Sequence, residues 1–380
     1  MFGHAIGLHA QELNLELPCS DEVWTARSAR EWERARRCHN PHGSITKPGF
    51  IDLLSIFTSE PNQAKEKVSP LDPFGTFITL HGLISVGWNQ RQTLLGIRIF
   101  LEIAVVILLD TANSQSDMVS QAGSTREWDG WKVGMERALY AWRSSTFEQY
   151  ASNRSTIEDK LPSLVLFRIA HITLHTSVID LQVLAGIGKV MGKPVTRGTK
   201  YGVLIRTMKE WVNSDGAVKS VRHALKLLSE TVFANPFYIS TSAQACDLMN
   251  HRLQWVEDTL DGIFHGKWCL YLATLTLWAW GALTSLWRRG SANGNSGYGQ
   301  NIKTEGGLYE SNEIGKDNQI AWNDAESYLK TMLAISAENK GESLMTTPWR
   351  LETRGLIIVI RNLLHSERWE LRIFSPYDSI

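Results

Sequence analysis

Cysteine is scarce in this chain, and the few cysteines that are present show no paired spacing. Four occur among 380 residues, at Cys19, Cys38, Cys246 and Cys269. Cysteines this few and this far apart exclude a disulfide scaffold and indicate a reducing compartment. The first residues also lack a basic end followed by an apolar core, so we predict no secretory signal.

An excess of charge of one sign is likewise absent. The chain has 39 Lys and Arg against 39 Asp and Glu, which gives a formal net charge of +0. A chain balanced in this way is not attracted as a whole to a polyanion, which argues against generic nucleic-acid binding. Apolar residues make up 43% and charged residues 21%, a balance typical of a packed protein and not of a disordered one.

Patterns that build active sites or metal sites are also missing. His171 and His175 share a helical face, as in zinc proteases, but Ile172 stands where those enzymes need a glutamate. We therefore expect two histidines packed within a core. Cys38 and its neighbouring histidines have no second group of ligands nearby to complete a metal site.

Two glycine-rich runs depart from the nucleotide-binding loops that they resemble. Residues 186–192 place the third glycine one position late for a dinucleotide loop, and residues 262–267 have too few residues between glycines for a phosphate loop. We interpret both as turns at helix ends. We accordingly predict no catalytic, cofactor-binding or metal-binding residue in this chain.

The pattern that does run through the chain is helical. Apolar residues recur every three to four positions in most segments, so we predict an all-α fold: a single large helical domain of about ten helices. Asp72 followed by Pro73 predicts a helix start, and Ser28 with Glu31 predicts a capping box at another. Helices are expected over residues 73–88, 93–110, 128–142, 159–185, 217–232, 248–264, 267–287, 322–332 and 351–365.

Among these expected helices, three are defined by particular features. Residues 93–110 are apolar on nearly all sides, which predicts a central helix. The helix expected over residues 73–88 would carry Phe74, Phe77, Ile78, His81, Ile84 and Trp88 on one face. Residues 128–142 carry the clearest amphipathic stripe of the chain, which is formed by Trp128, Trp131, Met135, Leu139 and Trp142.

Residues 289–318 are rich in glycine, asparagine, serine and lysine. Such a composition buries too little apolar surface to offset the entropy lost on ordering. We therefore predict a disordered loop inserted between two helices of one domain that spans residues 1–380.

Residues 268–287 contain no charged side chain over twenty positions, which is long enough for a membrane span. Threonines and tryptophans within the segment favour a buried helix instead, and a single-pass membrane protein remains the alternative. The fifteen tryptophans also leave open an all-α enzyme of lipid or isoprenoid chemistry, although the chain has no Asp-Asp-x-x-Asp motif for magnesium.

Several stretches along the chain are similar in wording to one known family. They are Leu17–Ser20 with Trp24 and Ser28–Trp32, Leu80–Val86, Ala138–Ser145, Ile169–His175 with Asp180–Gln182, Trp268–Gly281, Thr353–Leu356 and Arg368–Leu371. Together they resemble the fungal-specific transcription factor domain, the regulatory region of fungal zinc-finger transcription factors. The stretches are distributed over most of the chain.

The resemblance implies a nuclear, non-enzymatic regulatory domain that controls RNA polymerase II transcription. In that family a zinc-finger module supplies DNA binding, with either Cys2His2 fingers or a six-cysteine cluster. The four scattered cysteines of this chain cannot form either one, and the front of the regulatory domain is also not recognisable. DNA and zinc are therefore expected only through a module absent from this chain, with a second copy or a coactivator as partner and no membrane.

Overall fold

The computed structural model describes most of the chain, and every structural statement below concerns the residues that it describes. They are residues 12, 15–39, 49–68, 71–111, 130–148, 157–190, 193–195, 199–233, 245–263, 265–292, 314–338 and 342–365. The C-terminal stretch Arg368–Leu371 lies outside them.

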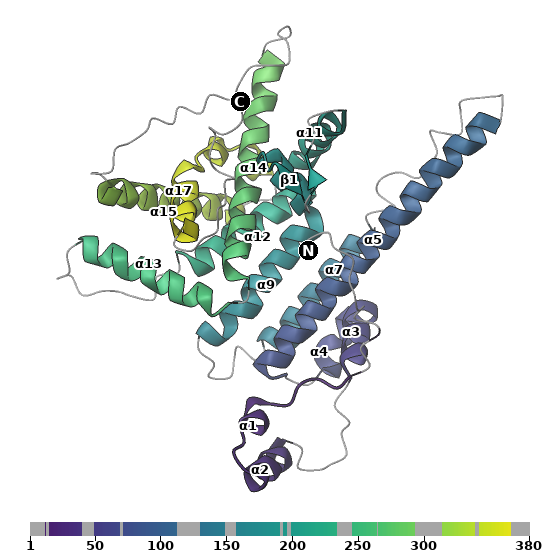
Figure 1. Cartoon of the computed structure of the whole chain (residues 1–380), viewed down its shortest axis with the longest axis vertical. Helices are drawn as coiled ribbons and strands as arrows, with labels where there is room; N and C mark the ends of the chain where they lie inside the picture. The colour runs from purple at the N-terminus through teal and green to yellow at the C-terminus, as the bar shows by residue number, and fades with distance from the viewer. Residues whose placement is uncertain are drawn as a thin grey trace. The chain divides into compact units, whose positions relative to one another are not determined.

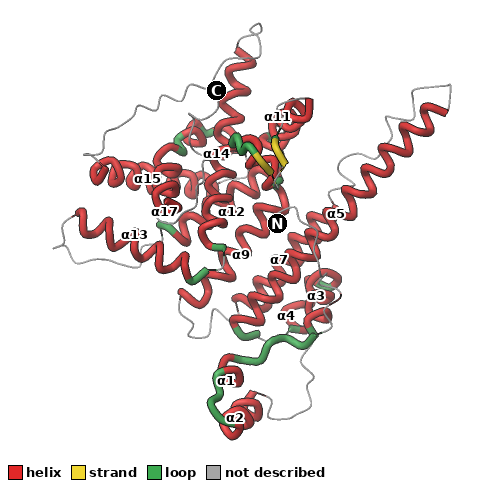
Figure 2. Tube along the Cα trace, viewed as in Figure 1, coloured by secondary structure: helices red, strands yellow, loops and turns green. Residues whose placement is uncertain are grey.

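The predicted all-α class is confirmed. The described residues form fifteen α-helices, four of which have seven residues or fewer, so the expected number of about ten agrees with the longer ones. The strands β1 (Lys189–Val190) and β2 (Lys193–Pro194) are two residues each and pair antiparallel. Figure 2 shows how little of the described trace they occupy.

Contacts group the chain into two compact units, one within residues 4–167 and the other from residue 168 onward. The boundary falls inside helix α9, between Phe167 and Arg168. Each unit is described separately below. One domain over residues 1–380 stays a prediction.

The first unit contains six α-helices and the first part of α9 (Figure 1). A turn of π-helix, Arg143–Phe147, follows α7. The helices are α1 (Asp21–Trp24), α2 (Ala29–His39), α3 (Phe50–Ser59), α4 (Ala64–Lys67), α5 (Pro73–Thr111), α7 (Gly130–Trp142) and α9 (Ile157–His175).

Helix α5 begins where the sequence predicts it. The side chain of Asp72 accepts a hydrogen bond from the Gly75 N–H at 2.6 Å, and Pro73 occupies the first helical position. The helix then continues without a break to Thr111, so two expected helices are one. It packs closely on α3, because a β-carbon at Gly82 would lie 2.5 Å from the Phe50 ring.

The buried face of α5 differs from the predicted one. Phe74, which the predicted apolar face includes, is 51% exposed, whereas Leu80 and Leu83, which it does not include, are fully buried. The stretch expected to be a central helix also starts in the open, since Ile97 is 44% exposed. Side chains from Arg98 onward in this helix lie outside the description.

Trp142 lies at the centre of the first unit. Its side chain is fully buried, and its indole N–H donates a hydrogen bond to the backbone carbonyl of Thr76 at 3.1 Å. Its ring stacks on Phe147 and Phe167, with centroids 5.9 and 5.8 Å away. The amphipathic stripe predicted over residues 128–142 is confirmed at Met135, Leu139 and Trp142, which are all buried.

The second unit contains the rest of α9 and eight further α-helices (Figure 1). A 3-10 turn, Pro348–Leu351, precedes the last of them. The helices are α10 (Val178–Leu184), α11 (Thr199–Val212), α12 (Asp215–Thr231), α13 (Ala245–Asp261), α14 (Gly266–Ala292), α15 (Ile314–Glu338), α16 (Glu342–Thr346) and α17 (Arg354–His365).

The single helix expected over residues 159–185 is broken. Helix α9 ends at His175, α10 begins at Val178, and the two are bent by 78°. Ser177 has extended backbone geometry, and its hydroxyl accepts a hydrogen bond from the Asp180 N–H at 3.3 Å. Ser177 therefore starts a new helix with its own N-cap, which a pattern of apolar residues alone does not reveal.

Helix α14 forms the core of the second unit. It packs against α12, α17, α11 and the 3-10 turn, and the side chains of Leu270, Tyr271 and Trp280 are fully buried. The fit to the 3-10 turn requires glycine at one position: a β-carbon on Gly281 would overlap the backbone carbonyl of Arg350.

The membrane interpretation of residues 268–287 finds no support in the structure. Among the described helices, no single one is both long and apolar enough to cross a membrane. By length and composition, the bent pair formed by residues 160–175 and 178–184 passes that test jointly. The side chains of α14 named above are instead enclosed by other helices of the unit.

The predicted loop 289–318 is shorter than expected. Helix α14 continues to Ala292 and α15 begins at Ile314, so both helices extend into the predicted range. Residues 293–313 lie outside the described part of the chain, and their disorder stays a prediction.

Candidate functional site: a polar cluster between helices α9 and α12

Two histidines meet in the interior of the second unit, one from α9 and one from α12. His171 is 1% exposed and His223 is 7% exposed. Their rings are stacked, with centroids 4.0 Å apart and planes inclined by 11°. The sequence-based expectation of a packed core histidine is confirmed for His171. His223, its partner, belongs to no motif in the sequence.

His175 does not share this position. It is half-buried, and its backbone carbonyl accepts a hydrogen bond from the indole N–H of Trp211 at 3.1 Å. Parallel rings keep their nitrogen lone pairs in parallel planes, so the His171–His223 stack does not aim two lone pairs at one ion. Within the described residues, no group of three or more His, Cys, Asp or Glu side chains is arranged to hold a metal ion.

The surroundings of His223 oppose a positive charge on its ring. Burial, followed by the nearby His171, Arg168, Lys226 and His175, lowers the pKa of His223 far below its ordinary value of 6.5. A general base must accept a proton during the reaction, and this environment opposes a positive charge on the ring. His223 is therefore unsuited to acid–base catalysis and acts as a packed aromatic ring.

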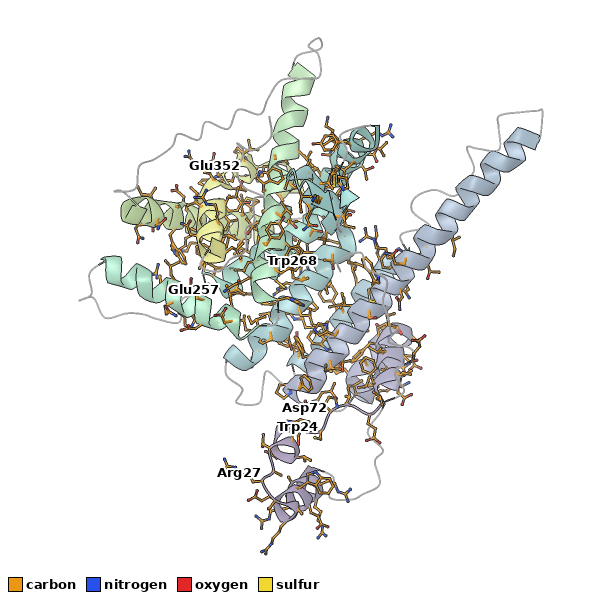
Figure 3. All side chains as sticks on the ribbon, viewed as in Figure 1. Trp24, Arg27, Asp72, Glu257, Trp268 and Glu352 are labelled. Atoms are coloured by element: carbon orange, nitrogen blue, oxygen red, sulfur yellow. The ribbon has the colours of Figure 1, made fainter. Side chains whose placement is uncertain are left out.

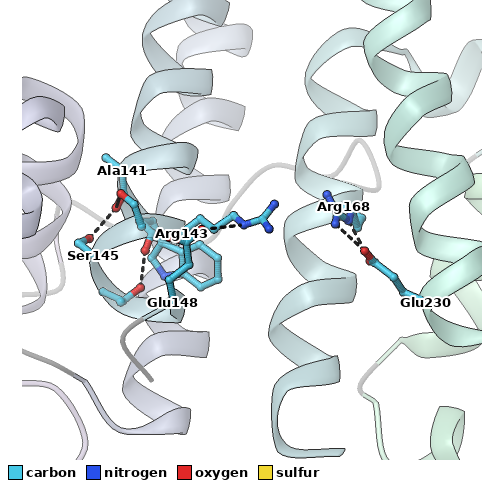
Figure 4. A network of polar contacts seen from close by, with 9 residues as sticks. Ala141, Arg143, Ser145, Glu148, Arg168 and Glu230 are labelled. Atoms are coloured by element: carbon cyan, nitrogen blue, oxygen red, sulfur yellow. Dashed lines mark hydrogen bonds and ion pairs between the residues drawn. The ribbon is translucent and has the colours of Figure 1, made fainter. Parts of the chain in front are cut away.

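A partly buried ion pair also joins the two helices. The Arg168 guanidinium on α9 makes two hydrogen bonds to the Glu230 carboxylate on α12, from Nε at 3.0 Å and from Nη2 at 2.6 Å (Figure 4). The Arg168 side chain is 4% exposed and that of Glu230 is 31% exposed. This parallel two-bond geometry fixes orientation as well as charge, because both groups are planar.

Two hydroxyl groups complete the contact near the end of α9. Thr176 Oγ1 and Ser220 Oγ are hydrogen-bonded at 2.7 Å, and Ser220 also donates to the Ile172 carbonyl at 3.4 Å. Thr176 and Ser220 are both buried. The polar cluster, as we name it, consists of His171, His223, Arg168, Glu230, Thr176 and Ser220. It holds α9 and α12 in one register.

The polar cluster brings no reactive groups together. Burial also keeps three other ionisable groups of the unit in their protonated, uncharged forms. Burial raises the pKa of the Cys269 thiol to about 12, so this cysteine stays protonated and unreactive. Burial also raises the pKa of Tyr271 and Tyr328. The alternative of a lipid or isoprenoid enzyme gains no support, since the described residues hold no magnesium-type ligand group.

A second polar network, in the first unit, is local to one turn. The hydroxyl of Ser145 donates to the Ala141 carbonyl at 2.6 Å, and Arg143 pairs with Glu148 at 3.5 Å (Figure 4). The Arg143 guanidinium also lies over the Phe167 ring, 5.5 Å from its centroid. These contacts stabilise the π-helical turn after α7 and bring no reactive groups together.

Comparison with known proteins gives a matching family model and several curated relatives. Residues 1–144 match the family model described as "Fungal specific transcription factor domain". The chain is 25% identical over 286 residues to a nicotinate catabolism cluster-specific transcription factor of Emericella nidulans. It is 24% identical over 288 residues to zinc finger protein klf1 and over 293 residues to zinc finger protein zas1, both of Schizosaccharomyces pombe.

Each of these similarities covers 74% of this chain but only 26 to 30% of the relative. The chain thus spans less than a third of the length of the curated relatives that it matches. No solved structure gave a significant match. Residues 1–144 are thus similar to the fungal-specific transcription factor domain, and the chain is similar over 74% of its length to relatives named as a transcription factor and as zinc finger proteins.

Proposed function

We propose that the chain is a regulatory region of a nuclear transcription factor that controls RNA polymerase II transcription. The observation that carries the proposal is the similarity, over 74% of this chain, to a protein named as a cluster-specific transcription factor. The match of residues 1–144 to the fungal-specific transcription factor domain supports it independently. The proposal includes that the chain is not an enzyme and holds no cofactor.

DNA contact, in this proposal, belongs to a zinc-finger module that these 380 residues do not contain. Two of the relatives are named zinc finger proteins, whereas the four cysteines of this chain are too scattered to form a finger. The balanced net charge of the chain also gives no electrostatic basis for binding DNA through the phosphate backbone. Zinc is accordingly assigned to the missing module alone.

A helical region of this kind can control an attached DNA-binding module through its partners. A second copy or a coactivator that prefers one arrangement of the helices shifts the population towards that arrangement. Within the described residues, the polar cluster fixes α9 against α12, so it can hold these helices in the arrangement that a partner binds. The direction of control, activation or repression, is an outcome of the test.

The test joins residues 1–380 to an unrelated DNA-binding domain and measures transcription from a reporter that carries its operator in a fungal host. We expect a change of at least several-fold relative to the DNA-binding domain alone. A matched control carries Gly281→Trp, which disrupts the packing of α14 on Arg350 and should abolish the change. Equal reporter signals for the fusion and the DNA-binding domain alone contradict the proposal.

Two further measurements test the finer parts. The purified chain without fusion should show no sequence-specific retention of duplex DNA in a mobility-shift assay. A fluorescent fusion of the chain, expressed together with its zinc-finger module, should accumulate in the nucleus. Sequence-specific binding by the chain alone would overturn the assignment of DNA contact to another module.

A further inference from the structure

Helix α2 of the first unit carries a row of arginines on one side. Arg30, Arg34 and Arg37 are spaced by four and three residues, so they lie on one helical face along about 10 Å of the axis. Arg27 lies before the start of the helix, three residues ahead of Arg30. All four side chains are exposed. We name these residues the arginine face.

Exposure is a property of the whole helix and not only of its charged side. Every described side chain from Ala29 to Cys38 is exposed except the half-buried Ala35. Trp32 is 44% exposed, and the Arg36 guanidinium lies over its ring, 5.1 Å from the centroid. Such a helix has little burial of its own to stabilise it, and an amphipathic helix of this length gains most of its stability from packing.

A second exposed tryptophan, Trp24, ends helix α1, three residues before Arg27. Trp24 is 80% exposed, the largest exposure among the large apolar side chains described, and α1 and α2 contact each other. Figure 3 labels Trp24, at the end of α1, and Arg27, in the bend that joins α1 to α2. An indole left this open exposes an apolar surface whose burial by a partner is favourable.

The charge of this segment is local and positive. Between Arg27 and Cys38 there are five arginines and two glutamates, for a net charge of 5 − 2 = +3, whereas the whole chain has a net charge of +0. The two acidic residues of α1, Asp21 and Glu22, bring the net charge of residues 21–38 to 5 − 4 = +1. Both glutamates of α2 have contacts within the segment. Glu31 accepts a hydrogen bond from the Arg27 N–H at 2.9 Å, and Glu33 pairs with Arg37 at 2.5 Å.

We propose that α1 and the arginine face of α2 form a docking surface for an acidic protein segment that also carries apolar side chains. Arginine guanidinium groups match carboxylates with two parallel hydrogen bonds. The exposed indoles of Trp24 and Trp32 receive the apolar side chains of the same segment. This proposal stands on the geometry of α1 and α2 and does not depend on the proposed function.

A protein partner fits this surface better than a nucleic acid. Tryptophan and arginine are the residues most enriched where binding energy concentrates in protein interfaces. Phosphate contact alone would use the arginines and leave the 80% exposed indole of Trp24 without a role. An acidic segment with apolar side chains satisfies both features together.

The test uses the whole chain and a synthetic probe. The probe is a 20-residue peptide in which Asp and Glu alternate at helical spacing with Leu and Phe, and binding is measured by titration calorimetry at 0.15 M salt. One control peptide replaces Asp and Glu with Asn and Gln, and another replaces Leu and Phe with Ser. The acidic, apolar peptide should bind at least tenfold more tightly than either control.

Variants locate the binding on the surface. Arg30→Glu with Arg34→Glu should weaken binding at least tenfold, and Trp24→Ser should weaken it about fivefold. A matched control with the same change of charge, Lys65→Glu with Arg361→Glu, alters exposed residues elsewhere and should bind like the wild type. Arg34→Gln, which removes one charge without reversing it, should give an intermediate loss. Thermal unfolding of each variant verifies the fold.

Three results would overturn the proposal. The first is equal binding by wild type and the Arg30→Glu, Arg34→Glu variant when both are folded. The second is equal binding of the acidic peptide and its serine-substituted control, which would leave charge as the sole attraction. The third is tighter, arginine-dependent binding of a 20-base-pair DNA duplex, which would assign the surface to a nucleic acid.

Discussion

The imidazole rings of His171 and His223 lie face to face with their centroids 4.0 Å apart, although they come from different helices. Each ring is nearly enclosed by protein, and Arg168 and Lys226 add positive potential to the effect of burial on His223. The stack is consequently compatible only with an uncharged ring at His223. Three effects oppose a positive charge on this ring: desolvation, the neighbouring histidines, and the two cations Arg168 and Lys226.

The stability of the chain should depend on pH through this ring. The pKa of His223 is lowered in the folded state from 6.5, so below that pH the unfolded chain binds a proton that the folded chain does not. The free energy of unfolding therefore keeps its full value above pH 6.5, and below that pH it falls by up to about 1.4 kcal/mol per pH unit. Denaturant unfolding of wild type and His223→Gln between pH 7.5 and 4.5 measures this.

Plotted against pH, the free energy of unfolding should differ in slope between the two proteins, and not only in value. His223→Gln keeps a polar, uncharged side chain, so its free energy of unfolding should fall less steeply below pH 6.5 than that of the wild type. Between pH 7 and 8 the substitution should shift the free energy without changing its slope. Equal slopes in both proteins below pH 6.5 would contradict the assignment of an uncharged His223.

The Arg168–Glu230 pair should show strong coupling. Glu230→Gln leaves the Arg168 guanidinium, 4% exposed, without a matching charge, and we expect a loss of about 2–3 kcal/mol in the free energy of unfolding. This lies at or below the lower end of the range for fully buried pairs, because the Glu230 side chain is 31% exposed. Replacing both residues, Arg168→Met with Glu230→Leu, should recover most of the loss. In the double-mutant cycle formed with the single variants Arg168→Met and Glu230→Leu, additive losses would exclude a direct coupling.

Gly281 should not tolerate even one extra carbon. A β-carbon there would overlap the Arg350 carbonyl, and backbone cannot move aside as cheaply as the end of a side chain. We expect Gly281→Ala to lower the free energy of unfolding by about 1–3 kcal/mol. The matched control is Gly202→Ala on the exposed part of α11, where no atom lies within 4 Å and alanine should raise stability by up to about 1 kcal/mol.

Trp142 should be the most sensitive tryptophan of the first unit. Trp142→Phe keeps a ring but loses the hydrogen bond to the Thr76 carbonyl and part of the stacking, and should cost about 1–2 kcal/mol. Trp142→Ala should cost about 3–5 kcal/mol. Trp24→Phe, at an 80% exposed position, is the control and should change the free energy of unfolding by less than about 0.5 kcal/mol. Similar losses at both positions would place Trp142 outside the core.

Local sequence signals were read correctly where the chemistry is local. The predicted capping residues of α2 are in contact: the Glu31 N–H donates to the Ser28 hydroxyl at 3.2 Å. The Glu31 carboxylate, however, accepts from the Arg27 N–H and not from that of Ser28. The helix predicted over residues 217–232 is likewise present as α12, in which Ala217, Val221 and Leu228 are fully buried.

The predictions differ from the structure where two adjacent faces of one helix are equally apolar. On α5, the row with Phe74 and the row with Leu80 and Leu83 are adjacent and both hydrophobic, so periodicity does not decide which one is enclosed. The structure buries the leucine row against α3 and α7. The break between α9 and α10 was missed because Ser177 is one small polar residue within a largely apolar stretch.

The sequence by itself determined the helical class, several helix starts and the buried stripes, because each depends on neighbours within a few positions. Tertiary structure alone decided that His171 stacks on His223 and that Arg168 pairs with Glu230. These partners lie more than fifty residues apart along the chain, and only the packing of α9 on α12 brings them together. The burial that lowers the pKa of His223 exists only after that packing, so no periodicity within one helix predicts it.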